Sequence, residues 1–342
     1  MVFQVKYCEG RYEYFREILK NPQAVVILVH FFQPKSKEPK LNIAITGGTG
    51  FIGRYILRQF NQPTHSLKAW KRNESRLDGV EDIPLQWISG GLDDADSMQA
   101  LVKDCDAVVH AAHWKPGRLF QGGEGNLGKF AEMNILGTLN LVRASIDAGV
   151  QRFVFLSTCA VYDRILTDRP LDESHPLWPR SHYGATKAAI EKFTHSYARD
   201  EGFNICSLRP CGVYGQAHPA ESSKFFELVK QVSEGGTVNV SKGGKEVHAA
   251  DVAKAIDILL QADHVAGEAF NCYDRYVSEY EVAHLARELS GSNASIHGET
   301  KQPVHQIATE RIEALGMQFG GRPLLKRTIE QLIESAQTTG KS

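Results

Sequence analysis

The sequence lacks the features that mark several classes of protein. Its 39 Lys and Arg residues are balanced by 40 Asp and Glu residues, so charge gives no reason to expect nucleic acid or an anionic membrane as a partner. No apolar run reaches the roughly 20 residues of a membrane-spanning helix. The sequence also lacks the pattern of a signal peptide, which is a basic segment followed by an apolar run and a cleavage site. We therefore expect a cytoplasmic protein.

The cysteines lack the spacing of a metal or redox site. They are scattered without a CxxC pair, which zinc-binding and redox motifs typically contain. Half of them fall in or beside apolar runs, as packed and reduced thiols do. The sequence therefore predicts no metal site. The cysteines are Cys8, Cys105, Cys159, Cys206, Cys211 and Cys272.

What the sequence does contain is a glycine-rich turn between an apolar run and a helical pattern. Leu41–Thr46 is a short apolar run that ends in small residues, and Phe51–Phe60 has the spacing of an amphipathic helix. A strand, a tight turn and a helix in this order are typical of a nucleotide-phosphate site. We predict that a dinucleotide binds here.

Five residues of this turn are candidates for cofactor binding. Gly47 permits the tight turn, and Gly50 lets backbone N–H groups approach a pyrophosphate. Gly53 lets the new helix lie close to the sheet. Phe51 and Ile52 supply further N–H groups at the helix N-terminus, where the partial positive charge favours phosphate.

The choice between the two nicotinamide dinucleotides depends on the end of the next apolar run. Lys71 and Arg72 follow that run, and no acid occurs before Glu74. A basic residue at this place pairs with the 2′-phosphate of NADP, whereas an acid binds the ribose hydroxyl of NAD. The pair favours NADP over NAD, although an exposed Lys-Arg pair is also common in solvated loops.

Apolar runs and helical patterns then alternate. This alternation is typical of a parallel sheet covered by helices on both faces, so we predict an α/β fold with a Rossmann-type doubly wound sheet. Ala111 lies in the small residues at the end of one run, where the cofactor would pass closely. The expected strands are residues 65–70, 86–89, 107–112 and 152–156, and the expected helices are residues 94–102 and 130–148.

A tyrosine and a lysine follow at helical spacing. Tyr183 and Lys187 are four residues apart, so their side chains share one face of a helix. The charge of Lys187 would lower the pKa of Tyr183, which could then exchange a proton with a hydroxyl or carbonyl while hydride moves to or from nicotinamide. Thr158, at the end of a strand, supplies a hydroxyl for the same substrate oxygen. A Tyr-x-x-x-Lys pair alone has little specificity.

In this order the motifs resemble the extended short-chain dehydrogenase/reductase superfamily, and within it the NAD-dependent epimerase/dehydratase family. The resemblance implies that Thr158, Tyr183 and Lys187 are catalytic, that Lys187 also binds the nicotinamide ribose, and that Asn134 completes a tetrad. Cys159 follows Thr158 where sugar dehydratases of the family carry an acid, which excludes dehydration. The motifs are TGGTGFIG (46–53), HAA (110–112), NILGT (134–138), YGATK (183–187) and LRPCGVYG (208–215).

The resemblance also suggests how the chain is divided. We expect residues 1–40 to be an appendage and linker, and residues 41–208 to be the cofactor-binding domain with the catalytic residues. Residues 209–336 are expected to be mainly a smaller mixed substrate-binding lobe, with some segments returning to the sheet. Residues 337–342 are expected to fray.

Three polar features of the lobe have two interpretations each. Arg209 and His248 either contact an anionic ligand or order a turn. The KGGK stretch at residues 242–245 either contacts a nucleotide diphosphate or forms a solvated hairpin turn.

The leading functional prediction is an NAD(P)-dependent epimerase or reductase that acts on a secondary alcohol or ketone of a sugar-like substrate, in particular a nucleotide sugar. A homodimer through its long helices is also predicted. One alternative is an NADPH-dependent ketone or aldehyde reductase that resembles the dihydroflavonol-reductase branch. The other is a non-catalytic dinucleotide-sensing protein, which the presence of both Tyr183 and Lys187 disfavours.

Overall fold

The computed structural model describes residues 41–117 and 122–339. The appendage and linker predicted for residues 1–40 lie outside the described residues. Among the residues that are described, no helix combines the length and the apolar character needed to cross a bilayer.

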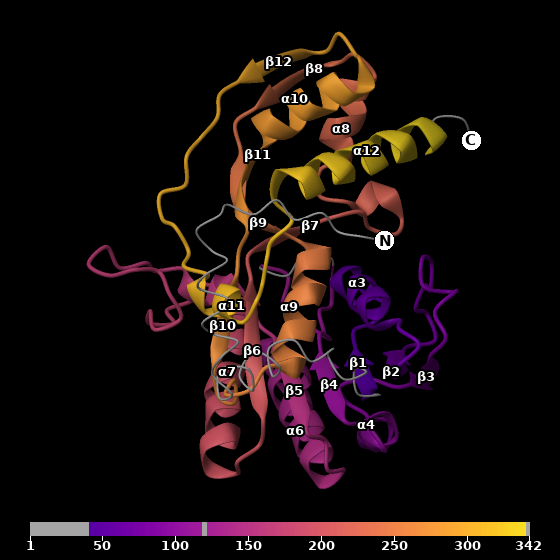
Figure 1. Ribbon diagram of the computed structural model, residues 1–342, viewed down its shortest axis with the longest axis vertical. Helices are drawn as coiled ribbons and strands as arrows, with labels where there is room; N and C mark the ends of the chain where they lie inside the picture. Colours follow the sequence, from indigo (N-terminus) through magenta and orange to yellow (C-terminus); the bar gives the residue numbers. More distant parts are fainter. Residues whose placement is uncertain (1–40, 118–121, 340–342) are drawn as a thin grey trace, which may run out of the picture. The chain divides into compact units, whose positions relative to one another are not determined.

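A parallel sheet of seven strands organises the described chain (Figure 1). The strand order is β10-β6-β5-β4-β1-β2-β3. Later strands are added on one side of β1, as β2 and then β3, and on the other side of β4, as β5, β6 and β10. Ligands are therefore expected at the carboxyl ends of β1 and β4, where the order changes direction. The strands are β1 (Leu41–Thr46), β2 (His65–Lys71), β3 (Gln86–Ser89), β4 (Ala107–His110), β5 (Arg152–Leu156), β6 (Ile205–Pro210) and β10 (Ala269–Cys272).

Helices cover both faces of this sheet because its strands are apolar on both sides. In β1, Ile43 and Ile45 pack with helices α3 (Phe51–Phe60) and α9 (Ala249–Gln261). Ala44 points the other way. It belongs to the core formed with α4 (Ala95–Val102), α6 (Gly137–Asp147) and α7 (His182–Asp200). The predicted doubly wound α/β fold is confirmed.

The helix expected over residues 130–148 differs from a regular α-helix. It begins earlier, with α5 (Leu127–Ala131), and continues through a π-helical segment (Glu132–Leu136) into α6. A π-helical turn inserts one residue and re-aims the side chains around it, which periodicity in a sequence does not reveal. Asn134 lies inside this segment.

The smaller lobe has its own core and two small sheets. Strands β7 (Gly212–Tyr214), β9 (Gly243–His248) and β11 (Arg275–Ser278) form one sheet, and β8 (Thr237–Val240) pairs with β12 (Ser295–Gly298). Their apolar side chains pack with helices α8 (Phe226–Ser233), α10 (Glu279–Ser290) and α12 (Gly321–Thr339). A short helix α11 (Glu310–Ala314) precedes α12.

One predicted strand boundary is wrong, and one of the two interpretations of residues 242–245 is excluded. Strand β4 ends at His110, because Ala111 and Ala112 turn into the following loop. The stretch at residues 242–245 is no hairpin turn, because its glycines belong to β9 and pair with β11. Helix α12 reaches Thr339, and residues 340–342 lie outside the described residues, so the fraying predicted for residues 337–342 stays a prediction.

Candidate active site

The glycine turn after β1 has the close approaches that only glycine allows. Gly47 has a φ of +73°, and a Cβ atom there would lie 2.7 Å from the carbonyl carbon of Ala111. A Cβ atom at Gly53 would lie 1.9 Å from the Gly47 oxygen. Gly50 donates its N–H to that same oxygen at 2.9 Å and is the N-cap of α3. Since Gly50 has no side chain to cap the helix, the N–H groups of its first turn are available to a phosphate.

A cleft of about 880 Å³ runs from this turn to α7. Its volume is typical of a small-molecule or cofactor site, and the glycine turn forms part of its wall, so the residues present fit a dinucleotide. Asn134 is not among the residues that line it. The predicted residues that do line it are Gly47, Gly50, Phe51, Ile52, Gly53, Lys71, Arg72, Ala111, Thr158, Tyr183 and Lys187.

The basic pair at the end of β2 borders the cleft but is partly neutralised. Arg72 forms an ion pair with Glu74 at 3.2 Å, and both side chains are 68% exposed. The backbone N–H of Arg72 donates to the Ser75 hydroxyl at 3.0 Å. Because an exposed ion pair contributes little free energy, Arg72 can leave Glu74 for another anion. This geometry accommodates either NAD or NADP.

Helix α7 brings Tyr183 and Lys187 to the carboxyl end of β5. Burial raises the pKa of Tyr183, and a hydrogen bond with the Thr158 side chain opposes that shift. The ammonium nitrogen of Lys187 donates to the Leu156 carbonyl at 2.6 Å and lies 4.6 Å from the centre of the Phe155 ring. Burial lowers the pKa of Lys187 to about 7.

These shifts overturn one prediction. The charge of Lys187 was expected to lower the pKa of Tyr183, but the pKa of Tyr183 is raised. Two desolvation effects explain the difference. Burial of the phenol disfavours the phenolate, and burial of Lys187 favours its neutral amine.

The low pKa of Lys187 predicts a dependence of stability on pH. Between about pH 7 and the ordinary lysine pKa of 10.5, the unfolded chain holds a proton on this lysine that the folded protein lacks. The stability of the wild type relative to Lys187→Met is therefore expected to rise with pH in this window, by at most about 1.4 kcal/mol per unit. Urea unfolding at several pH values measures it.

Lys192→Met is the matched control, because Lys192 is exposed on the same helix. It is expected to leave the pH profile of stability unchanged. A difference between wild type and Lys187→Met that stays flat from pH 7 to 10 would contradict the low pKa.

A hydrogen-bonded series connects the ends of β1 and β4 to the π-helical segment. Thr46 Oγ1 accepts from the Ala112 N–H at 3.1 Å and lies 2.7 Å from His110 Nδ1. His110 Nε2 lies 2.9 Å from Thr138 Oγ1, which donates to the Asn134 carbonyl at 2.6 Å. Burial lowers the pKa of His110 to about 3. The sequence indicated His110 only as part of the HAA motif, not as a structural connection.

Asn134 holds the loop that follows β4. Its side-chain oxygen accepts from the Trp114 N–H at 2.8 Å, and its amide nitrogen donates to the carbonyls of Trp114 and Phe130, each at 3.0 Å. In the same loop the ring of His113 packs edge-on against Tyr183, with 5.1 Å between ring centres. Asn134 is thus a positioning residue in this structure, and its place in a catalytic tetrad stays a prediction. No pattern in the sequence pointed to His113.

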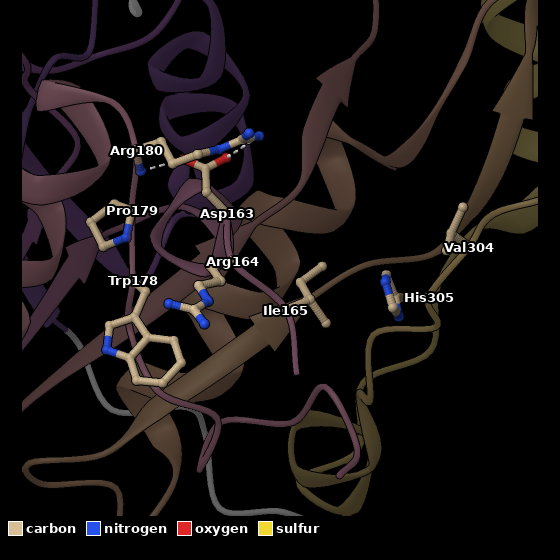
Figure 2. A pocket seen from close by; sticks show the side chains of 8 residues that line it. All are labelled: Asp163, Arg164, Ile165, Trp178, Pro179, Arg180, Val304 and His305. Carbon is tan, nitrogen blue, oxygen red and sulfur yellow. Dashed lines mark hydrogen bonds and ion pairs between the residues drawn. The ribbon is translucent and has the colours of Figure 1, made fainter. Parts of the chain in front are cut away.

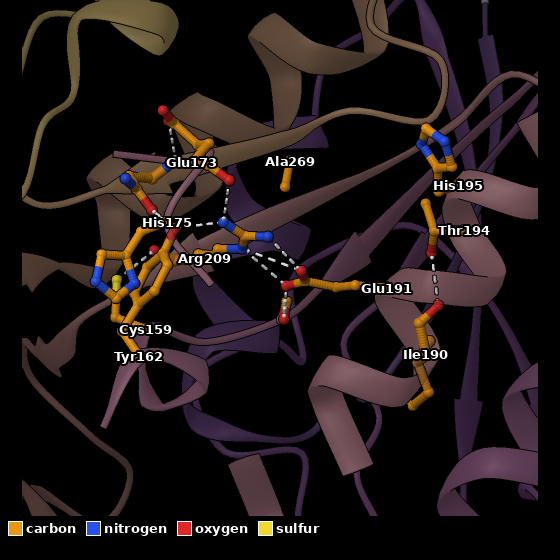
Figure 3. A network of polar contacts seen from close by, with 12 residues as sticks. Cys159, Tyr162, Glu173, His175, Ile190, Glu191, Thr194, His195, Arg209 and Ala269 are labelled. Atoms are coloured by element: carbon orange, nitrogen blue, oxygen red, sulfur yellow. Dashed lines mark hydrogen bonds and ion pairs between the residues drawn. The ribbon is translucent and has the colours of Figure 1, made fainter. Parts of the chain in front are cut away.

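A buried ion pair joins α7 to β6 (Figure 3). Arg209 Nη2 donates to Glu191 at 2.5 Å, and its Nε contacts both oxygens of the same carboxylate, at 3.0 and 3.1 Å. Arg209 also donates to the Tyr162 hydroxyl, and the Ser157 hydroxyl donates to Glu191. Arg209 therefore orders the protein interior, and no ligand is needed to explain it.

His248 also has a structural role. Its Nδ1 accepts from the Ala250 N–H at 3.0 Å and caps the start of α9. Of the two interpretations of Arg209 and His248 from sequence, the ordering role is the one that the structure displays.

A second hollow, of about 800 Å³, lies on the surface (Figure 2). One side presents Trp178, whose ring lies 5.2 Å from the guanidinium carbon of Arg164. Asp163 accepts from the Arg180 N–H at 2.8 Å. The polar groups at this place thus contact one another, and none of the predicted site residues lines it.

Comparison with protein families gives one match that covers most of the chain. The model of the NAD-dependent epimerase/dehydratase family matches residues 43–272. Among curated proteins, the low-salt glycan biosynthesis protein Agl12 of Haloferax volcanii is 31% identical over 68% of this chain and 76% of its own length. A ketoreductase of Stigmatella aurantiaca, which acts on a farnesylated dihydroquinoline oxide, is 34% identical over 54% of each chain.

Solved structures share the fold. The UDP-glucose 4-epimerase of Thermotoga maritima, solved with UDP-glucose, has a TM-score of 0.72 at 20% identity and covers 87% of this chain and 99% of its own. The RMD protein of Pseudomonas aeruginosa, solved with NADPH, has a TM-score of 0.69 at 19% identity and covers 88% and 98%. At these identities the similarity shows the fold alone.

Proposed function

The chain belongs to the NAD-dependent epimerase/dehydratase family, and we propose that it transfers hydride to or from a secondary alcohol or ketone of a sugar-like substrate. As a member of this family it is an NAD(P)-dependent enzyme of the extended short-chain dehydrogenase/reductase superfamily. One observation carries the proposal: Thr158, Tyr183 and Lys187 line the same cleft as the glycine turn. In this proposal Tyr183 is the acid/base, Thr158 orients the substrate oxygen, and Lys187 anchors the nicotinamide ribose.

Bound NAD(P) would accept or supply the hydride. Neutral Tyr183 can donate a proton to a carbonyl oxygen, and its phenolate can accept one from a hydroxyl. Its raised pKa keeps the neutral form dominant near pH 7, which suits the direction of reduction. Oxidation needs a positive charge that stabilises the phenolate, and protonated Lys187 would provide it. Epimerisation is oxidation followed by reduction from the other face and uses the same residues.

Two kinds of similarity support two candidate substrates. The likeness to a glycan biosynthesis protein, and to the UDP-glucose 4-epimerase of Vibrio cholerae at 26% identity over 74% of this chain, favours a sugar-like substrate, and a nucleotide sugar in particular. The likeness to a ketoreductase, together with Lys71 and Arg72 in the cleft, favours a one-way NADPH-dependent ketone reductase as the second candidate. The alternative of a non-catalytic dinucleotide sensor is not proposed, because the chain is an enzyme of this family.

The cofactor preference is tested by thermal unfolding with NAD, NADH, NADP and NADPH at equal concentrations. A ligand at about 100 times its Kd stabilises the folded state by roughly 2.7 kcal/mol. We expect the phosphorylated pair to raise the melting temperature more, because Lys71 and Arg72 offer cations to the 2′-phosphate. In the variant Lys71→Glu/Arg72→Glu this difference should vanish while the NAD shift remains. A larger shift with NAD in the wild type would contradict the NADP preference and favour a redox-neutral epimerase.

The proposed homodimer would use the faces of α7 and of the long helix that contains the π-helical segment. Large apolar side chains are exposed there, with Leu136 at 54% and Phe193 at 44%. Sedimentation of the wild type and of Leu136→Lys/Phe193→Lys tests this. A wild type that stays monomeric at high concentration would exclude it.

A further inference from the structure

Two cysteine side chains are in direct contact beside the cleft. The thiol of Cys211 donates to the sulfur of Cys159, and 3.2 Å separates the two sulfur atoms. The Cys159 thiol donates in turn to the carbonyl oxygen of Arg209 at 3.1 Å. Cys159 directly follows Thr158, and Cys211 directly follows β6. Because 52 residues separate the two cysteines in the chain, no CxxC spacing indicates this contact.

The pair differs in exposure from the other described cysteines. Cys105, Cys206 and Cys272 are buried, whereas Cys159 and Cys211 are partly exposed. Cys211 also lines the cleft that contains the glycine turn. A small molecule that enters the cleft therefore comes next to this pair, whereas the buried thiols are shielded from it.

A metal ion does not explain the contact. A structural zinc site has four ligands, and the pair supplies two thiols. Among residues 41–117 and 122–339, no group of three His, Cys, Asp or Glu side chains could hold a metal ion. Two thiols in contact have another chemistry, because they can join in a disulfide. Forming it brings the sulfur atoms from 3.2 Å to about 2.05 Å, an approach that the two segments share.

Cys159 belongs to the turn that holds Thr158 in place. The Thr158 side chain accepts from the N–H of Ala160 at 3.2 Å and so caps the short 3₁₀-helix Cys159–Tyr162. The same side chain forms a hydrogen bond with Tyr183. Because Cys159 lies between the two residues of this cap, a bond that draws its sulfur toward the other thiol also displaces the Thr158 hydroxyl.

We propose that Cys159 and Cys211 form a redox-sensitive modification site, at which hydrogen peroxide converts the two thiols to a disulfide. The bond is expected to lower turnover by displacing Thr158. This effect rests on the proposed function, because it assumes that Thr158 orients the substrate oxygen. The modification itself does not depend on that assumption.

The reaction takes two steps. Hydrogen peroxide first oxidises one thiol to a sulfenic acid, as its O–O bond breaks and one water molecule leaves. The second thiol then attacks this sulfur, so that the S–S bond forms, the S–O bond breaks and a second water molecule leaves. Together the two thiols lose two electrons and two protons, which the peroxide takes up. A thiol reductant reverses the reaction by thiol–disulfide exchange.

The reaction is expected to be slow. Burial raises the pKa of the Cys211 thiol well above its usual value, and the thiolate is the reactive form of a cysteine. Disulfide formation takes from seconds to hours, and we expect the slow end of this range. The pair therefore stays reduced unless peroxide persists.

Peptide mapping of the full-length protein tests the modification. The protein is treated with hydrogen peroxide, its remaining thiols are blocked, and tryptic peptides are analysed by mass spectrometry. We expect residues 153–164 to be linked to residues 200–224, which contain Cys159 and Cys211 respectively. Because the second peptide also contains Cys206, fragmentation of the linked pair locates the bond. Dithiothreitol should separate the two peptides.

Turnover is measured on the same samples, with UDP-glucose for an epimerase and with cyclohexanone for a ketone reductase. A misplacement of about 1 Å can lower a rate about 100-fold. Since the two segments share the approach, we expect kcat of the oxidised wild type to fall about 10-fold. Dithiothreitol should restore it.

Cys159→Ala and Cys211→Ala each remove one thiol, so neither should form the link. Each variant is compared with its own untreated form and should keep its turnover at the peroxide dose that links the wild type. Either variant suffices if the other does not fold. Cys206→Ala is the matched control, because it removes the other cysteine of the same peptide, a buried one on β6. It should respond to peroxide as the wild type does.

Two results would overturn the modification site: no linked peptides at a peroxide dose that leaves the circular dichroism unchanged, or a link between other cysteines. Linked peptides with unchanged turnover would overturn the effect on Thr158. The proposed function fails separately, when Tyr183→Phe keeps its turnover. The linked peptides would then still support the modification site.

Discussion

Tyr183→Phe is expected to lower kcat by about 10²- to 10⁴-fold, the usual contribution of a general acid or base. The variant loses only the hydroxyl that bonds with the Thr158 side chain. It keeps the ring that packs against His113, so the loop after β4 should stay in place. Turnover is measured with whichever substrate the wild type reduces or oxidises.

The cofactor should raise the melting temperature of this variant as much as that of the wild type, because the substitution does not alter the glycine turn. Tyr197→Phe is the matched control on the same helix, at a residue outside the cleft lining, and it should retain full turnover. If Tyr183→Phe kept the turnover of the wild type, Tyr183 would not be the acid/base.

Arg209→Met is expected to destabilise the fold by about 3–5 kcal/mol, the cost of leaving a buried charge without its partner. Glu191 would lose all its contacts with Arg209 and keep only the Ser157 hydroxyl among the hydrogen bonds described above. Both side chains of the pair are nearly inaccessible, with exposures of 5% and 4%. Urea unfolding monitored by circular dichroism measures the change.

Two further variants test this explanation. Glu191→Met/Arg209→Met removes both charges and should recover much of the loss, because two apolar side chains of similar volume need no compensation. Arg58→Met breaks an exposed pair with Asp82 at 2.9 Å, which should cost no more than about 1 kcal/mol. An Arg209→Met variant as stable as Arg58→Met would show that the buried pair is not required.

The features that the sequence predicted well are local ones. The bounds of β1, β3, β5 and α3 follow from short apolar runs, and from helical spacing next to turn residues. The glycine turn was recognised from its local pattern, although only the approach of Gly53 to Gly47 is local and Gly47 approaches Ala111, far along the chain. The placing of Tyr183 and Lys187 on one helical face needs only their spacing of four residues.

The features that the sequence did not predict depend on tertiary contacts. Glu191 and Arg209 are 18 residues apart and on different elements, and nothing in either segment indicates the other. The raised pKa of Tyr183 results from burial, which outweighs the charge expected from Lys187. The glycines at residues 243 and 244 resemble a turn in sequence, yet they lie in a strand where the side chain of Glu246 needs the space.

The series from Ala112 to Asn134 has a direction. Its first group, a backbone N–H, can only donate, and its last group, a backbone carbonyl, can only accept. Thr138 donates to this carbonyl, so its oxygen accepts from the Nε2–H of His110. In a neutral ring Nδ1 then carries no hydrogen, and it accepts from the Thr46 hydroxyl. The proton of the neutral ring is thus fixed on Nε2. An imidazolium would place a second donor against Thr46 Oγ1, which already accepts from the Ala112 N–H, so these hydrogen bonds favour the neutral ring of His110, as its burial does.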